Sequence, residues 1–215
     1  MEYHEHKKYF ETAYNSGTDF WTHLPFKARG AMLIEKLAPG ALILDIGSGR
    51  GMFAKQLAEM GFRVIGIDYI KSVVEKANAE IKNWGLEGKL KFLEGDALNM
   101  PFVDGHFDAA CDFGLLENLY KEDWEKYASE VNRILKPGGY YLNISLSRET
   151  QQFFDFRPKG SPTGDFEKFD VHYHFFKNEE MKNIFDHSLT PIVQDIKFTE
   201  RPEEIALLET LFQKK

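Results

Sequence analysis

The sequence predicts an α/β fold, with a doubly wound, mostly parallel sheet and helices on both of its faces. Apolar segments typical of buried strands alternate with helical segments from residue 41 to residue 147. The stretch ALILDIGSGRGMFAKQLAEMGFRVIGID, residues 41–68, joins a strand to a helix through three glycines and ends a second strand in an acid. The helices that follow the strands end at glycine or proline.

Short, nearly continuous apolar runs predict five buried strands. They cover residues 41–46, 63–68, 89–96, 107–114 and 140–147. Apolar residues at helical spacing predict the helices between them. These helices cover residues 52–61, 71–85 and 122–139, the last of them stopped by Pro137 and two glycines. Right-handed crossovers between parallel strands leave few possible topologies. In open sheets of this kind, a ligand is expected beyond the carboxyl ends of the strands.

The two flanks differ from this core. Residues 1–40 are expected to form helices and loops that end at Pro39-Gly40. Residues 148–170 contain two prolines and two glycines and are expected to form a long loop. A helix over 177–187 and a strand over 191–198 follow, and the segment EEIALLETLF, residues 203–212, is expected to be helical. The 215 residues are interpreted as one domain.

Composition narrows the class of protein. The net charge of −7 argues against broad binding to a nucleic-acid backbone, which needs a basic surface. Cys111, the single cysteine, rules out an intramolecular disulfide and a cysteine-rich zinc site. The N-terminus lacks the apolar core of a signal peptide, and no apolar run reaches the length of a membrane span. We therefore expect a cytoplasmic protein without a membrane partner.

The glycine turn carries the strongest local signal. Gly47, Gly49 and Gly51 are spaced G-x-G-x-G, whereas a dinucleotide fingerprint would place its third glycine at the position of Met52. The phosphate-binding G-x-x-x-x-G-K-[ST] pattern is also absent from the sequence. The start of the following helix still offers free N–H groups that suit a carboxylate. An NAD-dependent oxidoreductase is disfavoured but remains an alternative.

Five segments together resemble one enzyme family. LDIGSGRGMF, VIGID, GDALNMPF, FDAACDFGLLENL and LKPGGYYL resemble the class I S-adenosylmethionine-dependent methyltransferases, over roughly residues 40–147. The resemblance implies a Rossmann-like sheet, S-adenosyl-L-methionine as cofactor, S-adenosyl-L-homocysteine as product and a small-molecule methyl acceptor. It also divides the chain into an N-terminal helical lid (1–40), a cofactor-binding core (41–147) and a substrate-side region (148–215).

The resemblance implies which residues contact the cofactor. The implied set is Asp45, Gly47, Ser48, Gly49, Asp68, Tyr69, Asp96, Ala97, Asp112 and Phe113. The turn at residues 45–49 would pack under the methionine part, and Asp68 would accept hydrogen bonds from both ribose hydroxyls. Tyr69 would border the adenine, and Asp96 would read its amino group unless it is only a turn aspartate. Asp112 and Phe113 would lie where the cofactor meets the acceptor.

Catalysis by such an enzyme requires mainly alignment of the acceptor with the methyl group, so a general base is optional. The candidates are Glu117, expected to face the same cleft, and His172 and His174, expected on one side of an extended segment. Histidines that simply pack among aromatic residues are the competing interpretation. No carboxylate adjoins the two histidines at ligand spacing, so the sequence predicts no metal site.

Aromatic residues near the N-terminus suggest a lid over the cofactor. Tyr9, Tyr14 and the aromatic pair at 20–21 could attract the sulfonium by cation–π contact, and Lys27 or Arg29 could meet the cofactor carboxylate. A helix that merely docks on the sheet is the alternative. A non-catalytic protein that binds S-adenosylmethionine is a further alternative to the enzyme, and the acceptor and the oligomeric state stay open.

Overall fold

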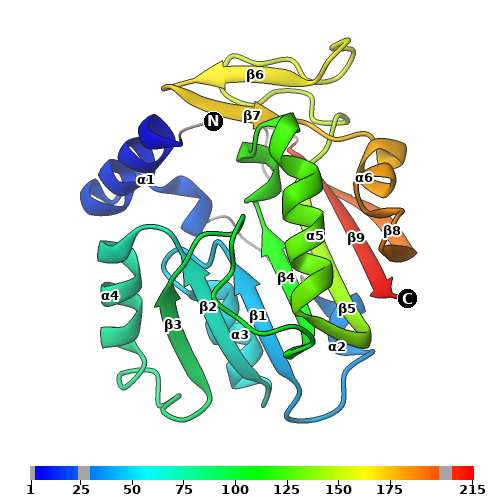
Figure 1. The fold of residues 1–215 in the computed structure, drawn as a ribbon. Coiled ribbons are helices and arrows are strands. Elements are labelled where there is room, and N and C mark those ends of the chain that lie inside the picture. Colours follow the sequence, from blue (N-terminus) through cyan, green and yellow to red (C-terminus); the bar gives the residue numbers. More distant parts are fainter. Residues whose placement is uncertain (1–2, 24–29, 199–204) are drawn as a thin grey trace.

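The structure, a computed structural model, describes residues 3–23, 30–198 and 205–215. Its centre is a seven-stranded sheet in the order β3-β2-β1-β4-β5-β9-β8 (Figure 1). The strands are β1 Leu42–Ile46, β2 Arg63–Asp68, β3 Leu90–Glu94, β4 Phe107–Phe113, β5 Leu135–Leu146, β8 Leu189–Phe198 and β9 Ala206–Lys214. The first five are parallel, and β9 runs antiparallel to both β5 and β8. The expected doubly wound, mostly parallel α/β sheet is confirmed.

Two hydrophobic cores show that helices cover both faces of the sheet. The helices are α1 His4–Ser16, α2 Ala31–Ile34, α3 Met52–Glu59, α4 Lys71–Glu80, α5 Trp124–Ile134 and α6 Asn178–Phe185. One core joins apolar side chains of α2, α3 and α4 to the sheet, and the other joins α5 and α6 to its opposite face. Three short 3₁₀ segments complete the helical part: η1 Phe20–His23, η2 Leu116–Asn118 and η3 Lys121–Asp123.

Above the carboxyl ends of the parallel strands lie α1 and a separate hairpin (Figure 1). The hairpin consists of β6 Asp165–Lys168 and β7 Val171–His174, paired antiparallel. The sequence predicts an uninterrupted loop over 148–170, so β6 is a correction to that prediction. Its short, alternating DFEK segment becomes a strand only because β7 supplies the hydrogen-bonding partner.

The C-terminal segment was the largest error of secondary structure. EEIALLETLF was expected to be helical, but residues 206–214 form β9 between β5 and β8. Seven of its nine residues are buried because neighbouring strands flank it and apolar side chains leave both of its faces. Apolar residues on both faces give no period of two, and the spacing of Leu207, Leu208 and Leu211 imitates a helix.

Two further elements differ in extent from the sequence prediction. β5 begins at Leu135, five residues before the predicted strand, so that Pro137 lies within the strand, beside a shift in register against β4. In the region before residue 41, the only regular helix described after η1 is the four-residue α2.

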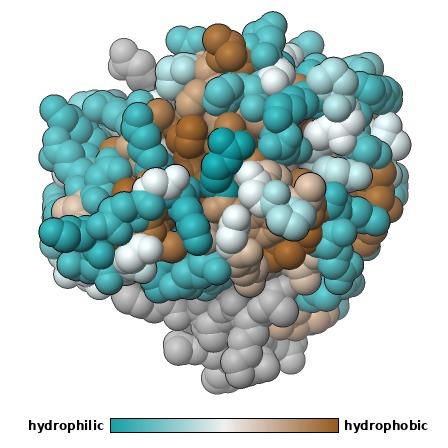
Figure 2. All heavy atoms as spheres, turned by 90° about the horizontal axis from the view of Figure 1, so that it is seen from below, coloured by the Kyte–Doolittle hydropathy of each residue, from teal (hydrophilic) through white to brown (hydrophobic). Residues whose placement is uncertain are grey.

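Within residues 3–23, 30–198 and 205–215, none of the helices combines the length and the apolar character that a bilayer crossing requires. The side of the molecule below the sheet in Figure 1 is mainly hydrophilic, with small separate hydrophobic areas (Figure 2).

Gly51 gives a direct test of packing under the glycine turn. It caps α3 with φ of +77°, and a Cβ at this position would overlap the ring of Phe92. We expect Gly51→Ala to lower the free energy of unfolding by about 2–4 kcal/mol, combining backbone strain with overpacking. Gly61→Ala is the matched control, because Gly61 has φ of +98° with open space around it. The control should lose only about 1 kcal/mol in urea denaturation, and equal losses would contradict the assigned overlap.

Candidate functional site

A cavity of about 800 Å³ lies at the carboxyl ends of the parallel strands. Side chains from the sheet, from α1 and from β7 line it. This volume is toward the upper end of the roughly 300–1,000 Å³ found for ligand sites.

Nine of the ten residues expected at the cofactor line this cavity. They are Asp45, Gly47, Ser48, Gly49, Asp68, Tyr69, Asp96, Ala97 and Phe113. They come from the ends of four neighbouring strands, β1 to β4, and the turns that follow. The sheet order β3-β2-β1-β4 brings these ends together although they span almost seventy residues of sequence.

Backbone hydrogen bonds fix the conformation of the glycine turn at the edge of the cavity. The N–H groups of Gly47 and Ser48 both donate to the carbonyl of Ile67, at 2.9 Å each. Gly47 has φ of +72°, and a Cβ there would press against Leu115. The turn therefore needs glycine for both its conformation and its close packing.

Asp68 ends β2 at the rim of the turn. Its Oδ2 accepts the N–H of Gly49 at 2.9 Å, and its Oδ1 accepts the N–H of Ile70 at 3.0 Å. Burial raises the pKa of this carboxyl to about 6, although the two backbone hydrogen bonds oppose the rise. Each oxygen retains a lone pair, so the carboxylate can accept two further hydrogen bonds from a ligand.

Asp45 and Ser48 present polar atoms without partners to the cavity. Asp45 Oδ2 and Ser48 Oγ are buried and have no hydrogen-bond partner among the residues that the structure describes. Burial raises the pKa of Asp45 to about 7, while the nearby Cys111 thiol opposes the rise. Buried polar atoms are normally satisfied, so both atoms fit a site completed by a polar, positively charged ligand.

The buried carboxyl of Asp45 predicts a pH dependence. Its folded pKa of about 7 lies above the ordinary 3.8, so between these values the folded chain holds a proton that the unfolded chain has released. Stability of the ligand-free protein is therefore lost as pH rises through this window. Asn does not titrate, so Asp45→Asn should not lose this stability. The unfolding free energy of the variant minus that of the parent should therefore rise by up to about 4 kcal/mol from pH 4 to pH 7.5. Urea denaturation across this range checks it, and a constant difference would contradict it.

Asp112 is the exception among the ten residues. It is fully buried and is not among the residues lining the cavity. Its carboxylate accepts hydrogen bonds from two backbone N–H groups, of Leu115 and Leu116. It also accepts from Tyr127, Tyr141 and Asn143, at 3.0–3.4 Å. The side chains of β4 alternate, so Asp112 points into the core under α5 while Phe113 faces the cavity. We assign it a structural role.

On the side of α1, the cavity lining includes Tyr14 and Trp21. Trp21 Nε1 donates to the Tyr14 hydroxyl at 3.2 Å, beside Gly49. Tyr9 does not line the cavity and instead stacks on Phe169 of the hairpin turn. Lys27 and Arg29, the expected partners of a ligand carboxylate, lie outside the described residues.

An ion pair that was not anticipated from the sequence joins the N-terminal segment to the glycine turn. Arg50 donates from Nε and Nη2 to the two carboxylate oxygens of Asp19, at 2.6 and 2.7 Å, and from Nη2 to the carbonyl of Tyr14. Asp19 is fully buried, and the Arg50 guanidinium beside it lowers its pKa against the effect of burial. The sequence offered one indication of this contact, because Arg50 lies between two glycines of the motif, Gly49 and Gly51.

The other end of α1 is tied to the wall of the cavity. The Tyr3 hydroxyl donates to Asp123 at 2.7 Å, and the backbone N–H of His172 donates to His6 Nε2 at 3.1 Å. Burial lowers the pKa of His6 to about 4, so the ring is neutral and can accept this bond. The segment of residues 3–14 thus contacts the sheet loops, the glycine turn and the hairpin.

Of the three residues considered as a general base, one lines the cavity and two do not. Glu117 lines the cavity, and its Oε2 accepts the N–H of Leu146 at 2.8 Å. His172 and His174 do not line it, because the alternation of β7 turns Tyr173 toward the cavity and both histidines away from it. Phe113, Phe153 and Tyr173 give this end of the cavity an aromatic wall.

The chain matches known proteins through its central part. Residues 44–143 match the family described as Methyltransferase domain. A sterol 24-C-methyltransferase of Gibberella zeae is 35% identical over 106 residues, which are 49% of this chain and 27% of that protein. A demethylmenaquinone methyltransferase of Thermus thermophilus is 37% identical over 122 residues, which are 56% of this chain and 53% of that protein. The chain thus matches about half or less of the length of these relatives.

The fold likeness extends over nearly the whole chain. A solved 1,6-didemethyltoxoflavin-N1-methyltransferase of Burkholderia thailandensis, with bound 1,6-didemethyltoxoflavin and S-adenosylhomocysteine, superposes with a TM-score of 0.81. The superposition covers 98% of this chain and 88% of that one at 21% identity. At that identity the likeness shows a shared fold.

Proposed function

We propose that this chain, which carries a class I S-adenosylmethionine-dependent methyltransferase domain, transfers a methyl group to a small-molecule acceptor held in the same cavity. One observation carries the proposal. A single cavity joins the glycine turn and the acids of β1 and β2 to an aromatic end under the lid and the hairpin.

The residues at the first end fit the cofactor. S-adenosyl-L-methionine supplies a methyl group activated by a sulfonium centre. The Asp68 carboxylate would accept hydrogen bonds from the ribose hydroxyls, and Tyr69 would border the adenine. Asp96 already accepts the N–H of Leu98 at 2.8 Å, as a turn aspartate does, and its remaining lone pairs would serve the adenine amino group. The unpartnered atoms Asp45 Oδ2 and Ser48 Oγ would receive the polar methionine part.

The second end favours an apolar or aromatic acceptor. Phe113, Phe153 and Tyr173 line it together with Leu146 and Leu207. The two curated relatives are named for sterol and demethylmenaquinone substrates, which belong to this chemical class. The acidic net charge gives no support to a nucleic-acid substrate.

The protein's contribution to the reaction is alignment and exclusion of water. The lid contacts made by Arg50 and Tyr3 would hold α1 over the bound ligands. If the acceptor carries a proton at neutral pH, we propose Glu117, which lines the cavity, as the base that takes it. His172 and His174 face away from the cavity, so we do not propose either one as the base.

The first test is calorimetric titration of the purified chain with S-adenosylmethionine, S-adenosylhomocysteine and NAD in parallel. We expect micromolar binding of the first two and none of NAD. Binding of NAD alone would reject the proposal in favour of an oxidoreductase. A screen of quinol, phenol and sterol acceptors with a methyl-labelled cofactor follows, and cofactor binding without transfer to any acceptor would favour a non-catalytic binding protein.

A further inference from the structure

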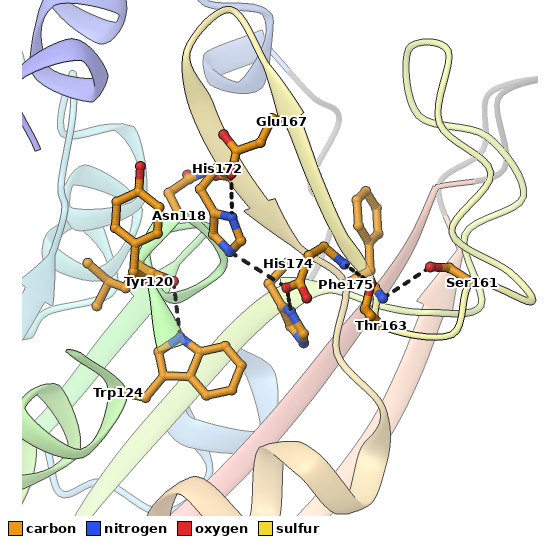
Figure 3. Close-up of polar contacts among 12 residues, drawn as sticks. Asn118, Tyr120, Trp124, Ser161, Thr163, Glu167, His172, His174 and Phe175 are labelled. Carbon is orange, nitrogen blue, oxygen red and sulfur yellow. Dashed lines mark hydrogen bonds and ion pairs between the residues drawn. The ribbon is translucent and has the colours of Figure 1, made fainter. Parts of the chain in front are cut away.

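The β6–β7 hairpin brings two buried histidines against three carboxylates, outside the cavity. His172 and His174 lie on the same side of the hairpin (Figure 3) and are 7% and 2% exposed. The antiparallel register places Glu167 opposite His172 and Asp165 opposite His174. Glu180 reaches the same cluster from α6.

Each imidazole is held through one nitrogen by its own carboxylate. His172 Nδ1 lies 2.9 Å from Glu167 Oε1, and His174 Nε2 lies 3.0 Å from Glu180 Oε2. Histidines that bind metals in proteins are almost always oriented in this way by a carboxylate or carbonyl on the other ring nitrogen. The two remaining nitrogens, His172 Nε2 and His174 Nδ1, both face Asp165.

His172 Nε2 lacks a partner that its surroundings should supply. It is buried and has no hydrogen-bond partner among the described residues. Because the Glu167 carboxylate can only accept, the neutral form of the His172 ring has its proton on Nδ1 and a lone pair on Nε2. That lone pair faces Asp165 Oδ1 at 3.8 Å. His172 Nε2 is buried, Asp165 is half exposed, and two electron-rich atoms turned toward each other are stabilised by a cation between them.

We propose that His172 Nε2, His174 Nδ1 and the Asp165 carboxylate bind a divalent transition metal of the zinc type. The three ligand atoms lie within 4.8 Å of one another. Ligand atoms about 2.1 Å from a tetrahedral metal lie roughly 3.4 Å apart, which is close to the 3.8 Å between His172 and Asp165.

Binding requires one local adjustment. Asp165 Oδ1 lies 2.5 Å from His174 Nδ1, so a proton occupies the space between them, and the metal would replace that proton. The carboxylate must move by about 1 Å to reach ligand spacing. The side chain of Asp165 is half exposed, so it is free to turn, and solvent can supply the fourth ligand.

The proposed metal site lies next to the aromatic wall of the cavity, on the opposite side of β7. Tyr173, between the two histidines, lines the cavity, and Asn118 Nδ2 donates to the carbonyl of His172 at 2.7 Å. A bound metal would therefore fix both strands of the hairpin in the position that places Tyr173 at the cavity. This inference rests on the hairpin and not on methyl transfer.

Cobalt absorption tests the proposal. Tag-free protein is treated with a chelator, and Co²⁺ is titrated while the visible absorption of tetrahedral cobalt is followed; Zn²⁺ is then added as competitor. We expect one Co²⁺ per chain, displaced by Zn²⁺, and a rise in melting temperature with Zn²⁺. Absence of the absorption band together with an unchanged melting temperature would overturn the proposal.

Variants locate the metal. Asp165→Asn and His172→Ala should weaken Co²⁺ binding by at least about tenfold, and Glu167→Gln, which only orients His172, by roughly tenfold. Asp165 and Glu167 are exposed, so these two variants test the site even if His172→Ala fails to fold. His187→Ala is the control, because His187, which follows the C-terminal end of α6, has a side chain that is 95% exposed. Equal affinity in all variants would place the metal elsewhere and reject the assignment.

Discussion

Asp68→Ala is expected to weaken binding of S-adenosylhomocysteine by roughly 10- to 150-fold, which corresponds to about 1.5–3 kcal/mol. The carboxylate is buried at the rim of the glycine turn and retains lone pairs for two hydroxyl donors. Its loss removes charge-assisted hydrogen bonds that the rest of the cavity cannot replace. Calorimetric titration of parent and variant measures the change.

Glu94→Ala is the matched control for this substitution. Glu94 ends β3, in register with Asp68 on β2, but it is exposed and does not line the cavity. Its replacement should leave the affinity unchanged.

A second ligand separates two roles of Asp68. The carboxylate also accepts the N–H of Gly49, so the variant could act through the turn alone. An S-adenosylhomocysteine analogue without ribose hydroxyls should bind parent and Asp68→Ala alike. If deleting the hydroxyls costs the same affinity in both proteins, the ribose assignment is wrong.

The cavity could be anticipated from sequence because its residues follow the ends of strands that the apolar pattern marks. Residues 43–46 and 66–68 are buried, so the strands that they end are mainly apolar in sequence, and Asp45 and Asp68 stand out in them. The parallel order then brings those ends together. Local sequence and topology agree here, which is why the prediction reached individual residues.

The errors arise where a partner distant in sequence decides the outcome. β9 becomes a strand between β5 and β8, more than sixty residues from the first of them. Asp165 and Glu167 become neighbours of the two histidines only through the hairpin register. For the same reason the sequence showed no carboxylate beside His172 and His174, and the expectation of no metal site rested on that missing contact.

For Asp112 the difficulty was not a distant partner. The family resemblance implied that it contacts the cofactor, but the alternation of side chains along β4 directs it into the core. We expect Asp112→Ala to lower the free energy of unfolding by about 3–5 kcal/mol, since it leaves five donors, four of them buried, without their acceptor. Asp112→Asn keeps one carbonyl oxygen and should lose less. Asp104→Ala is the control, because Asp104 is 82% exposed, and its change should stay within about 0.5 kcal/mol.

Urea denaturation and ligand titration of the same Asp112 variants distinguish the two roles. A structural carboxylate lowers the unfolding midpoint but leaves the affinity for S-adenosylhomocysteine close to that of the parent wherever the variant is folded. A binding carboxylate does the reverse. The buried Tyr127 and Tyr141 hydroxyls beside Asp112 favour the first result, because they occupy the lone pairs that a ligand would need. Unchanged stability with lost affinity would return Asp112 to the cofactor site.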